Sequence, residues 1–355
     1  MSGVLLYCRA GFENDAANEI QHKAAELGYY GFVKTKANSG FVCFECYQAD
    51  DAQQIVQKLP FTEMVFARQW FAYSAQFDEL DTDDRIGPLL AHILTIDDIG
   101  DLRVEHADST LGRELSKFCR KFTVPLRQVL RKHNKLAKTP HRKKPVLHVF
   151  FTSTNSAFVG VSFVQNNSPL ELGICRLKFP HQAPSRSTLK LEEAIHLFLT
   201  KEQQQKRFVP GMHAVDLGAC PGGWTYQLVE RGLFVQAIDN GMMADSLMET
   251  GQVKHYQEDG FKYRPKKKNV HWLVCDMIER PDKVARLMAQ WVAEGWCKEA
   301  IFNLKLPMKK RFESYLQAKE IIKQVMDKQG VGEFKLQAKH LYHDREEITL
   351  HLQLA

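Results

Sequence analysis

Residues 213–224 constrain the fold more than any other part of the sequence, and they read His-Ala-Val-Asp-Leu-Gly-Ala-Cys-Pro-Gly-Gly-Trp. An apolar run ends at Asp216, a turn rich in glycine and proline follows, and residues 225–231 have a helical pattern. A strand, a tight turn and a helix in this order begin a doubly wound α/β sheet, in which ligands bind beyond the carboxyl ends of the strands. The glycines let the backbone approach a ligand, and the helix start offers free N–H groups.

Two phosphate-binding motifs are excluded at this turn by the residues themselves. Gly223 is followed by Trp224 and not by Lys and Ser or Thr, so the turn is not a Walker loop. The glycines do not have the G-x-G-x-x-G spacing of a dinucleotide site either. The remaining interpretation is a nucleoside-type ligand whose charge is not mainly phosphate; the alternative is a turn that only packs a helix on a strand.

Length and composition indicate a multidomain protein without a membrane span. A chain of 355 residues predicts two or three domains, and a formal charge of +6 suggests an anionic partner. No apolar run approaches the roughly 18 residues that a span needs. Eight cysteines are scattered without a disulfide or zinc framework, which fits the cytoplasm and predicts no metal site. We interpret the pair Cys43 and Cys46 as two cysteines of one strand.

The first 75 residues have the element order of a ferredoxin-like domain. Strands are predicted over 4–8, 30–35, 40–46 and 64–73, with helices over 13–27 and 51–58. This β-α-β-β-α-β order is the split pattern of an α+β fold, which hosts many functions.

The block 76–165 is marked by positive charge. After an acidic stretch (78–84) it has a predicted helix near 85–94 and strands over 102–105, 146–151 and 157–163. Between Lys117 and Lys144 lie eleven Lys and Arg residues and no acid, at positions 117, 120, 121, 127, 131, 132, 135, 138, 142, 143 and 144. Such a run predicts contacts with phosphates, which give affinity but not sequence choice. The alternative is a solvated basic face.

Residues 166–186 are rich in Asn, Ser, Pro and Gly, and we expect a linker there. From 187 to 355 strands alternate with helices, which predicts an α/β domain. The strands are expected at 213–216, 234–238, 271–275, 300–304 and 347–352.

Three acids and two lysines lie where ligands of such a domain bind. Asp239 ends the second strand and could accept two ribose hydroxyls, Asp259 could meet an adenine amino group, and Asp276 ends the strand next to the first. Lys305 ends an apolar strand, a costly position unless the lysine is paired or has a function. Lys190 lies on a helix that precedes the glycine turn.

These residues carry a resemblance to a known family. The sequence Asp-Leu-Gly-Ala-Cys-Pro-Gly-Gly-Trp, preceded by Ser-Arg-Ser-Thr-Leu-Lys-Leu, resembles the FtsJ-type (RrmJ-like) RNA 2′-O-ribose methyltransferases. These enzymes use S-adenosyl-L-methionine and a Lys-Asp-Lys-Glu tetrad. The resemblance implies that the catalytic residues are Lys190, Asp276, Lys305 and Glu347, although Glu346 is an alternative for the acid.

Over its whole length, the chain resembles the RlmM-type bacterial methyltransferases that modify a cytidine of 23S ribosomal RNA. The stretches 66–71, 117–127, 176–180, 303–310 and 342–347 carry this likeness. It implies a ferredoxin-like domain (1–75), a THUMP RNA-binding domain (76–165), a linker (166–186) and a Rossmann-like class I methyltransferase domain (187–355). The partner would be 23S RNA, naked or in an early large-subunit assembly intermediate, and the protein a monomer.

The resemblance also implies a division of labour in the site. Ser187 and the turn residues Cys220, Pro221, Gly222 and Gly223 would contact the methionine part of the cofactor, Asp239 its ribose, Asp259 its adenine region and Asp276 both cofactor and substrate. Lys305 would be the general base, because desolvation and the neighbouring Lys190 cation favour loss of a lysine proton. Cys220 stands where Ala is usual in the family, and Asp276 is followed by Met-Ile-Glu and not by Met-Ala-Pro.

Two other functions fit parts of the pattern. An RNA cytosine-C5 methyltransferase needs a nucleophilic cysteine, and Cys220 and Cys275 both lie near the expected cleft. A ribosome assembly factor that only binds RNA needs neither the acids nor the lysines.

Overall fold

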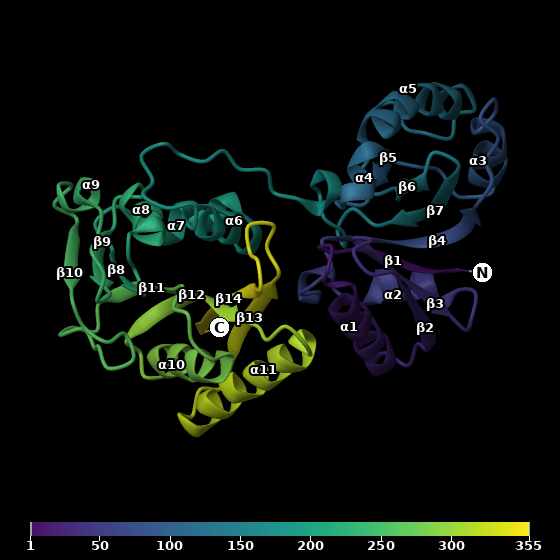
Figure 1. Cartoon of the computed structure of the whole chain (residues 1–355). Coiled ribbons are helices and arrows are strands. Elements are labelled where there is room, and N and C mark those ends of the chain that lie inside the picture. Colours follow the sequence, from purple (N-terminus) through teal and green to yellow (C-terminus); the bar gives the residue numbers. More distant parts are fainter. Residues whose placement is uncertain (1, 355) are drawn as a thin grey trace. The chain divides into compact units, whose positions relative to one another are not determined.

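A computed structural model describes residues 2–354, which fold as two compact units that meet between Ile174 and Cys175 in the chain. Each unit has its own seven-stranded sheet (Figure 1). Within the described residues no helix combines the length and the apolar character that a membrane span requires.

The first unit is an α+β fold around one mixed sheet with the strand order β2-β3-β1-β4-β7-β6-β5. Its elements are β1 (Gly3–Tyr7), α1 (Glu13–Glu26), β2 (Gly31–Thr35), β3 (Phe41–Cys46), α2 (Asp51–Lys58), β4 (Gln69–Phe77), α3 (Ile86–Ile93), β5 (Asp101–His106), α4 (Thr110–Glu114), α5 (Ser116–Lys132), β6 (Val146–Ser153) and β7 (Ser156–Ser162). The elements β1 to β4 with α1 and α2 confirm the predicted ferredoxin-like order.

Strand β4 joins the two modules that the sequence separates at residue 75. It pairs with β1 on one side and with β7 on the other, so both modules share one sheet. The strand expected over 64–73 begins only at Gln69. The earlier residues form a loop because the buried carboxylate of Glu19 accepts the N–H groups of Val65 and Phe66, at 2.6 and 2.9 Å.

Helix α5 carries much of the basic block and buries its apolar side. Cys119, Phe122, Leu126 and Leu130, three or four residues apart, are buried, as expected for an amphipathic helix. The helix ends at Lys132, so the block continues into a non-helical segment. Eight of its cations are exposed, at positions 117, 120, 121, 131, 132, 138, 142 and 143.

The first half of the expected linker is bound to the first unit. Asn166 donates to the backbone oxygens of Val56 and Leu59, and the N–H of Leu172 donates to the buried Glu105 at 2.8 Å. Chain 166–174 is therefore held in place by side chains of this unit.

The second unit has a Rossmann-like sheet with the order β10-β9-β8-β11-β12-β14-β13. The first five strands of this order run parallel, and β14 is antiparallel between β12 and β13. Its elements are α6 (Thr188–Phe198), α7 (Lys201–Arg207), β8 (His213–Leu217), α8 (Gly223–Val229), β9 (Phe234–Ile238), α9 (Asp245–Met248), β10 (Val253–Tyr256), β11 (Val270–Cys275), α10 (Pro281–Ala293), β12 (Cys297–Lys305), α11 (Arg311–Lys328), β13 (Phe334–Lys339) and β14 (Glu347–Leu354). This architecture confirms the predicted class I methyltransferase fold.

Candidate active site

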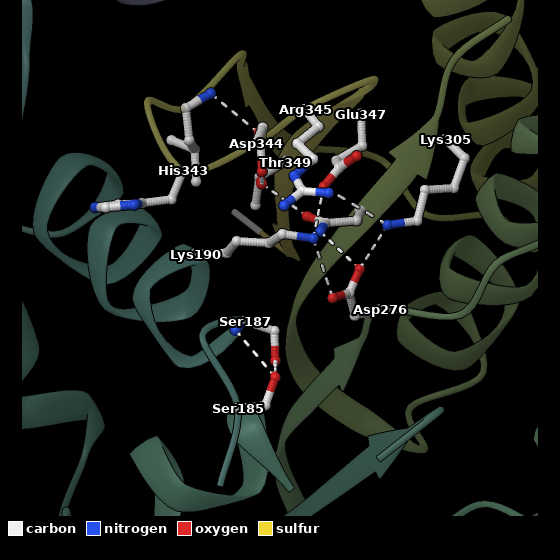
Figure 2. A network of polar contacts seen from close by, with 12 residues as sticks. Ser185, Ser187, Lys190, Asp276, Lys305, His343, Asp344, Arg345, Glu347 and Thr349 are labelled. Atoms are coloured by element: carbon white, nitrogen blue, oxygen red, sulfur yellow. Dashed lines mark hydrogen bonds and ion pairs between the residues drawn. The ribbon is translucent and has the colours of Figure 1, made fainter. Parts of the chain in front are cut away.

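The glycine turn leads from β8 into α8 and leaves no room for side chains. Gly222, directly before α8, has a φ of 117°, a backbone conformation that residues with side chains rarely adopt. A side chain at Gly223 would collide with the hydroxyl of Ser187. Ser187 in turn lies 3.0 Å from the hydroxyl of Ser185, in the segment before α6 (Figure 2). The turn predicted from sequence is therefore a tight backbone cradle with Ser187 against it.

Asp239 ties the loop after β9 to the glycine turn. Its carboxylate accepts the N–H of Cys220 at 3.0 Å and that of Gly241 at 2.8 Å. One bond to each oxygen leaves further lone pairs for a ligand. Asp259 follows β10, accepts the N–H of Phe261 at 2.9 Å and has a side chain that is about half exposed.

Asp216, a buried acid near the end of β8, was not predicted as a residue of the site. One of its oxygens accepts a 2.7 Å bond from the Thr225 hydroxyl, and the other has no hydrogen-bond partner among the described residues. Burial raises the pKa of Asp216 to about 7. The signal that could have revealed it is an acid inside an otherwise apolar strand.

The four predicted catalytic residues meet in one cluster (Figure 2). Lys190 comes from α6, Asp276 directly follows β11, Lys305 ends β12 and Glu347 begins β14. Lys305 lies 2.9 Å from Asp276 and 3.7 Å from Glu347, measured from Nζ to the nearer oxygen. Lys190 lies 3.3 Å from Asp276 and 2.5 Å from Glu347. Two cations thus share two carboxylates, and all four side chains are mostly buried.

The carboxylates hold Lys190 in its charged form. Burial lowers the pKa of Lys190, but the charges of Asp276 and Glu347 outweigh burial, and the pKa lies above its ordinary value. Lys190 is therefore a fixed positive charge beside Lys305.

Strand register selects Glu347 rather than Glu346 for this cluster. In the antiparallel pair β12 and β14, Lys305 lies opposite Glu347. Glu346 instead forms an ion pair with Arg311 at 2.7 Å and is largely exposed.

A hydrogen-bonded chain behind Asp276 was not predicted. Asn303 donates to Asp276 at 2.8 Å, and the Thr349 hydroxyl donates to the Asn303 side-chain oxygen at 2.7 Å. The same hydroxyl lies 3.1 Å from both carboxyl oxygens of the buried Asp344. Asn303 and Thr349 lie opposite each other in the sheet, two residues from Lys305 and Glu347 and therefore on the same face. That spacing of two was the available sequence signal.

The carboxyl of Asp344 lies at the far end of this chain. Burial, and then the charge of Glu347, raise the pKa of Asp344 well above its ordinary value. The Thr349 hydroxyl is thus shared between the side-chain oxygen of Asn303 and the carboxyl of Asp344, while Asn303 donates its N–H to Asp276.

The two cysteines near the cleft do not resemble activated nucleophiles. Burial raises the pKa of the Cys275 thiol to about 12, and burial followed by the charge of Asp239 raises that of Cys220. The thiolate is the reactive form, so both environments oppose a cysteine mechanism. Among residues 2–354, no group of three or more His, Cys, Asp or Glu residues is placed to hold a metal ion.

Three family models match the chain, and together they define the class. The RlmM ferredoxin-like domain matches residues 1–71, the N-terminal domain of ribosomal RNA large subunit methyltransferase M matches 84–163, and the FtsJ-like methyltransferase matches 183–331. The second unit is thus an S-adenosyl-L-methionine-dependent methyltransferase of the FtsJ-like class, and the protein is a transferase.

Curated relatives identify the family. The chain is similar to ribosomal RNA large subunit methyltransferase M of Pseudoalteromonas atlantica, with 58% identity over 100% of this chain and 99% of the relative. Proteins of the same name from Vibrio parahaemolyticus and Aliivibrio salmonicida are 56% and 54% identical, over 98% and 99% of this chain and 98% of each relative. The chain therefore belongs to the ribosomal RNA large subunit methyltransferase M family. Among solved structures, TrmN from Thermus thermophilus aligns over 100% of both chains, with 13% identity and a TM-score of 0.35, and we base no conclusion on this similarity.

Proposed function

We propose that this protein methylates the ribose 2′-hydroxyl of a cytidine in 23S ribosomal RNA, with Lys305 as the general base. Membership of the family supports ribosomal RNA as the substrate. The observation that carries the proposed chemistry is the cluster in which Lys305 lies 2.9 Å from Asp276, next to the charged Lys190.

The residues around the glycine turn fit the cofactor. Ser187 and the turn 220–223 would hold its methionine part, Asp239 its ribose hydroxyls and Asp259 its adenine region, with Asp276 facing both cofactor and substrate. The tight backbone at Gly222 and Gly223 and the spare lone pairs of Asp239 support this fit. S-adenosyl-L-methionine supplies a methyl group bonded to a sulfonium, and this methyl group transfers readily to an oxygen nucleophile as its bond to sulfur breaks.

The chain's own residues manage the proton. As the ribose oxygen gains the methyl group, its O–H bond breaks and the proton passes to the Lys305 amine. Lys305 must be a free amine before this step. Once Lys305 has taken the proton, Asp276 and Glu347 would balance the two ammonium groups. A positioned base contributes about 10² to 10⁴ in rate.

The first unit would bring the RNA to this site. The eight exposed cations of the basic block can contact phosphates, and we assign the block to a THUMP-type RNA-binding domain over 76–165, after a ferredoxin-like domain over 1–75. Residues 166–186 would connect it to the methyltransferase domain, 187–355. An enzyme with this substrate would work in the cytoplasm, and we expect a monomer.

The test is transfer of a labelled methyl group from S-adenosyl-L-methionine to unmodified 23S RNA. Lys305→Ala should abolish transfer while cofactor binding survives. Lys298→Ala is the matched control, because Lys298 is exposed and lies at the other end of the same strand. Near-normal turnover of Lys305→Ala would contradict the assignment.

The position of the label distinguishes the reaction from its rival. Dinucleotides that resist nucleases indicate ribose methylation, whereas a methyl group on the base would indicate a cytosine-C5 enzyme. Label on assembly intermediates but not on naked RNA would keep the chemistry and identify the particle as the substrate.

A further inference from the structure

A pocket of about 550 Å³ adjoins Lys305 in the second unit, and its size is that of a small-molecule site. The loop after β11 and the start of α10 form one wall, the loop after β12 another, and the first turns of α11 a third. The residues that matter here are Glu279, Arg280, Lys305, Pro307, Ser314 and Gln317.

Sheet order places this pocket on the substrate side of the catalytic cluster. The residues that fit the cofactor follow β8, β9 and β10, whereas the pocket follows β11 and β12. In the order β10-β9-β8-β11-β12, Asp276 and Lys305 stand at the ends of the last two strands. A hydroxyl that gives its proton to Lys305 therefore has the cofactor residues on one side and this pocket on the other.

The charged side chains Glu279 and Arg280 of the pocket wall already form ion pairs or hydrogen bonds, whereas two polar side chains of the wall form none within the described residues. Arg280 forms two hydrogen bonds to Asp282, at 2.9 and 3.0 Å, and Glu279 pairs with Lys283 at 3.2 Å. The side chains of Ser314 and Gln317 make no hydrogen bond within the described part of the chain. Both can donate and accept, so they are available to a ligand with a mixed polar edge.

A second, independent observation indicates that this face binds something apolar. The three most exposed large apolar side chains of the described residues are Ile278, Met308 and Met242, at 90%, 83% and 73% exposure. All three lie in loops at the carboxyl ends of strands, after β11, β12 and β9. Ile278 and Met308 are each next in sequence to a residue of the pocket wall. Ile278 and Met308 thus place two exposed apolar side chains beside the pocket wall.

We propose that this pocket binds the base of the target nucleotide, with Ser314 and Gln317 contacting the polar edge of the base. Ile278 and Met308 would pack against the faces of the target base and its neighbours. Single-stranded RNA is recognised in this manner, with splayed bases stacked on side chains and bound along their edges. The proposal rests on the proposed function, because it assumes that the ribose of that nucleotide lies at Lys305.

The test combines Gln317→Leu with an RNA that has an abasic ribose at the target position. Leu has a similar size and no polar group, and Gln317 is exposed on α11, so the change leaves the core untouched. Gln317→Leu should lower kcat/KM for normal RNA about tenfold, the effect of one hydrogen bond, without changing cofactor affinity. Gln324→Leu, on the same helix but outside the pocket wall, should have no effect.

The abasic RNA shows whether Gln317 acts through the base. The wild type should lose activity on it, and Gln317→Leu should lose little more, because the contact is already missing. Independent, additive losses would overturn the proposal, and so would a wild-type kcat/KM for Gln317→Leu on normal RNA. If the wild type puts no label on the ribose of normal RNA, the proposed function itself is contradicted. The outcomes above contradict only the proposal that the pocket binds the base, so the two failures can be distinguished.

Discussion

The difference in unfolding free energy between Asp216→Asn and the wild type should shift in favour of the variant as the pH rises from 4 to 8. The carboxyl of Asp216 is buried at the end of β8 and has a pKa of about 7, against 3.8 for an ordinary aspartate. The folded protein therefore binds this proton more tightly than the unfolded chain does. Stability from the group is fully present below pH 3.8 and is lost as pH rises through 7.

The gap between the two pKa values corresponds to about 4 kcal/mol, which the wild type loses between pH 4 and pH 8. Asn has the same shape, keeps the acceptor for Thr225 and does not ionise. Contributions that do not depend on pH, and titrations elsewhere, cancel when the two proteins are compared at the two pH values.

Urea denaturation followed by tryptophan fluorescence would measure this difference, because four of the five tryptophans lie in the second unit. A stability difference between variant and wild type that stays constant from pH 4 to pH 8 would refute the reasoning. One buried oxygen of Asp216 has no hydrogen-bond partner among the described residues and lies close to the glycine turn in sequence, so the same variant should bind cofactor more weakly in a titration.

Two further changes test the site. Thr349→Val removes the hydroxyl bonded to Asn303, so the unfolding free energy should fall by about 1–3 kcal/mol and kcat should drop. Thr349→Ser keeps the hydroxyl and should keep both the stability and kcat of the wild type. Denaturation and methyl-transfer assays would measure these effects, and equal behaviour of the two variants would exclude the hydrogen-bonded chain. Gly223→Ala should weaken cofactor binding at least tenfold in calorimetry, because the added methyl group collides with Ser187, while Gly332→Ala, which meets nothing within 4 Å, should bind normally.

The sequence predicted the fold where its patterns were strong. The five strands expected after residue 187 are present, and all five lie inside the sheet. Strands β10 and β13, the sheet's two edges, were not predicted. Strand β10 has only four residues, whereas the alternation of polar and apolar side chains in β13 was an available signal. The loop at Val65 was mistaken for strand because its apolar residues are buried against Glu19, a contact that no local pattern reveals.

The site was predicted through strand ends and through the resemblance. Lys305 and Asp276 are conspicuous because a charged residue directly follows a buried apolar run. Asn303 and Thr349 are not, since their role depends on which strands pair and in which register. The choice between Glu346 and Glu347 depended on the same register.

Because of that register, the activity of the enzyme depends on correct pairing of β12 with β14. A slip of one residue between β12 and β14 would send Glu347 and Thr349 to the opposite face of the sheet and dismantle the cluster at once. Molecules with the wrong strand register would then be inactive and would not merely have a lower turnover. A poorly refolded preparation should show fewer active sites but an unchanged KM and pH profile, so its specific activity would count correctly paired molecules.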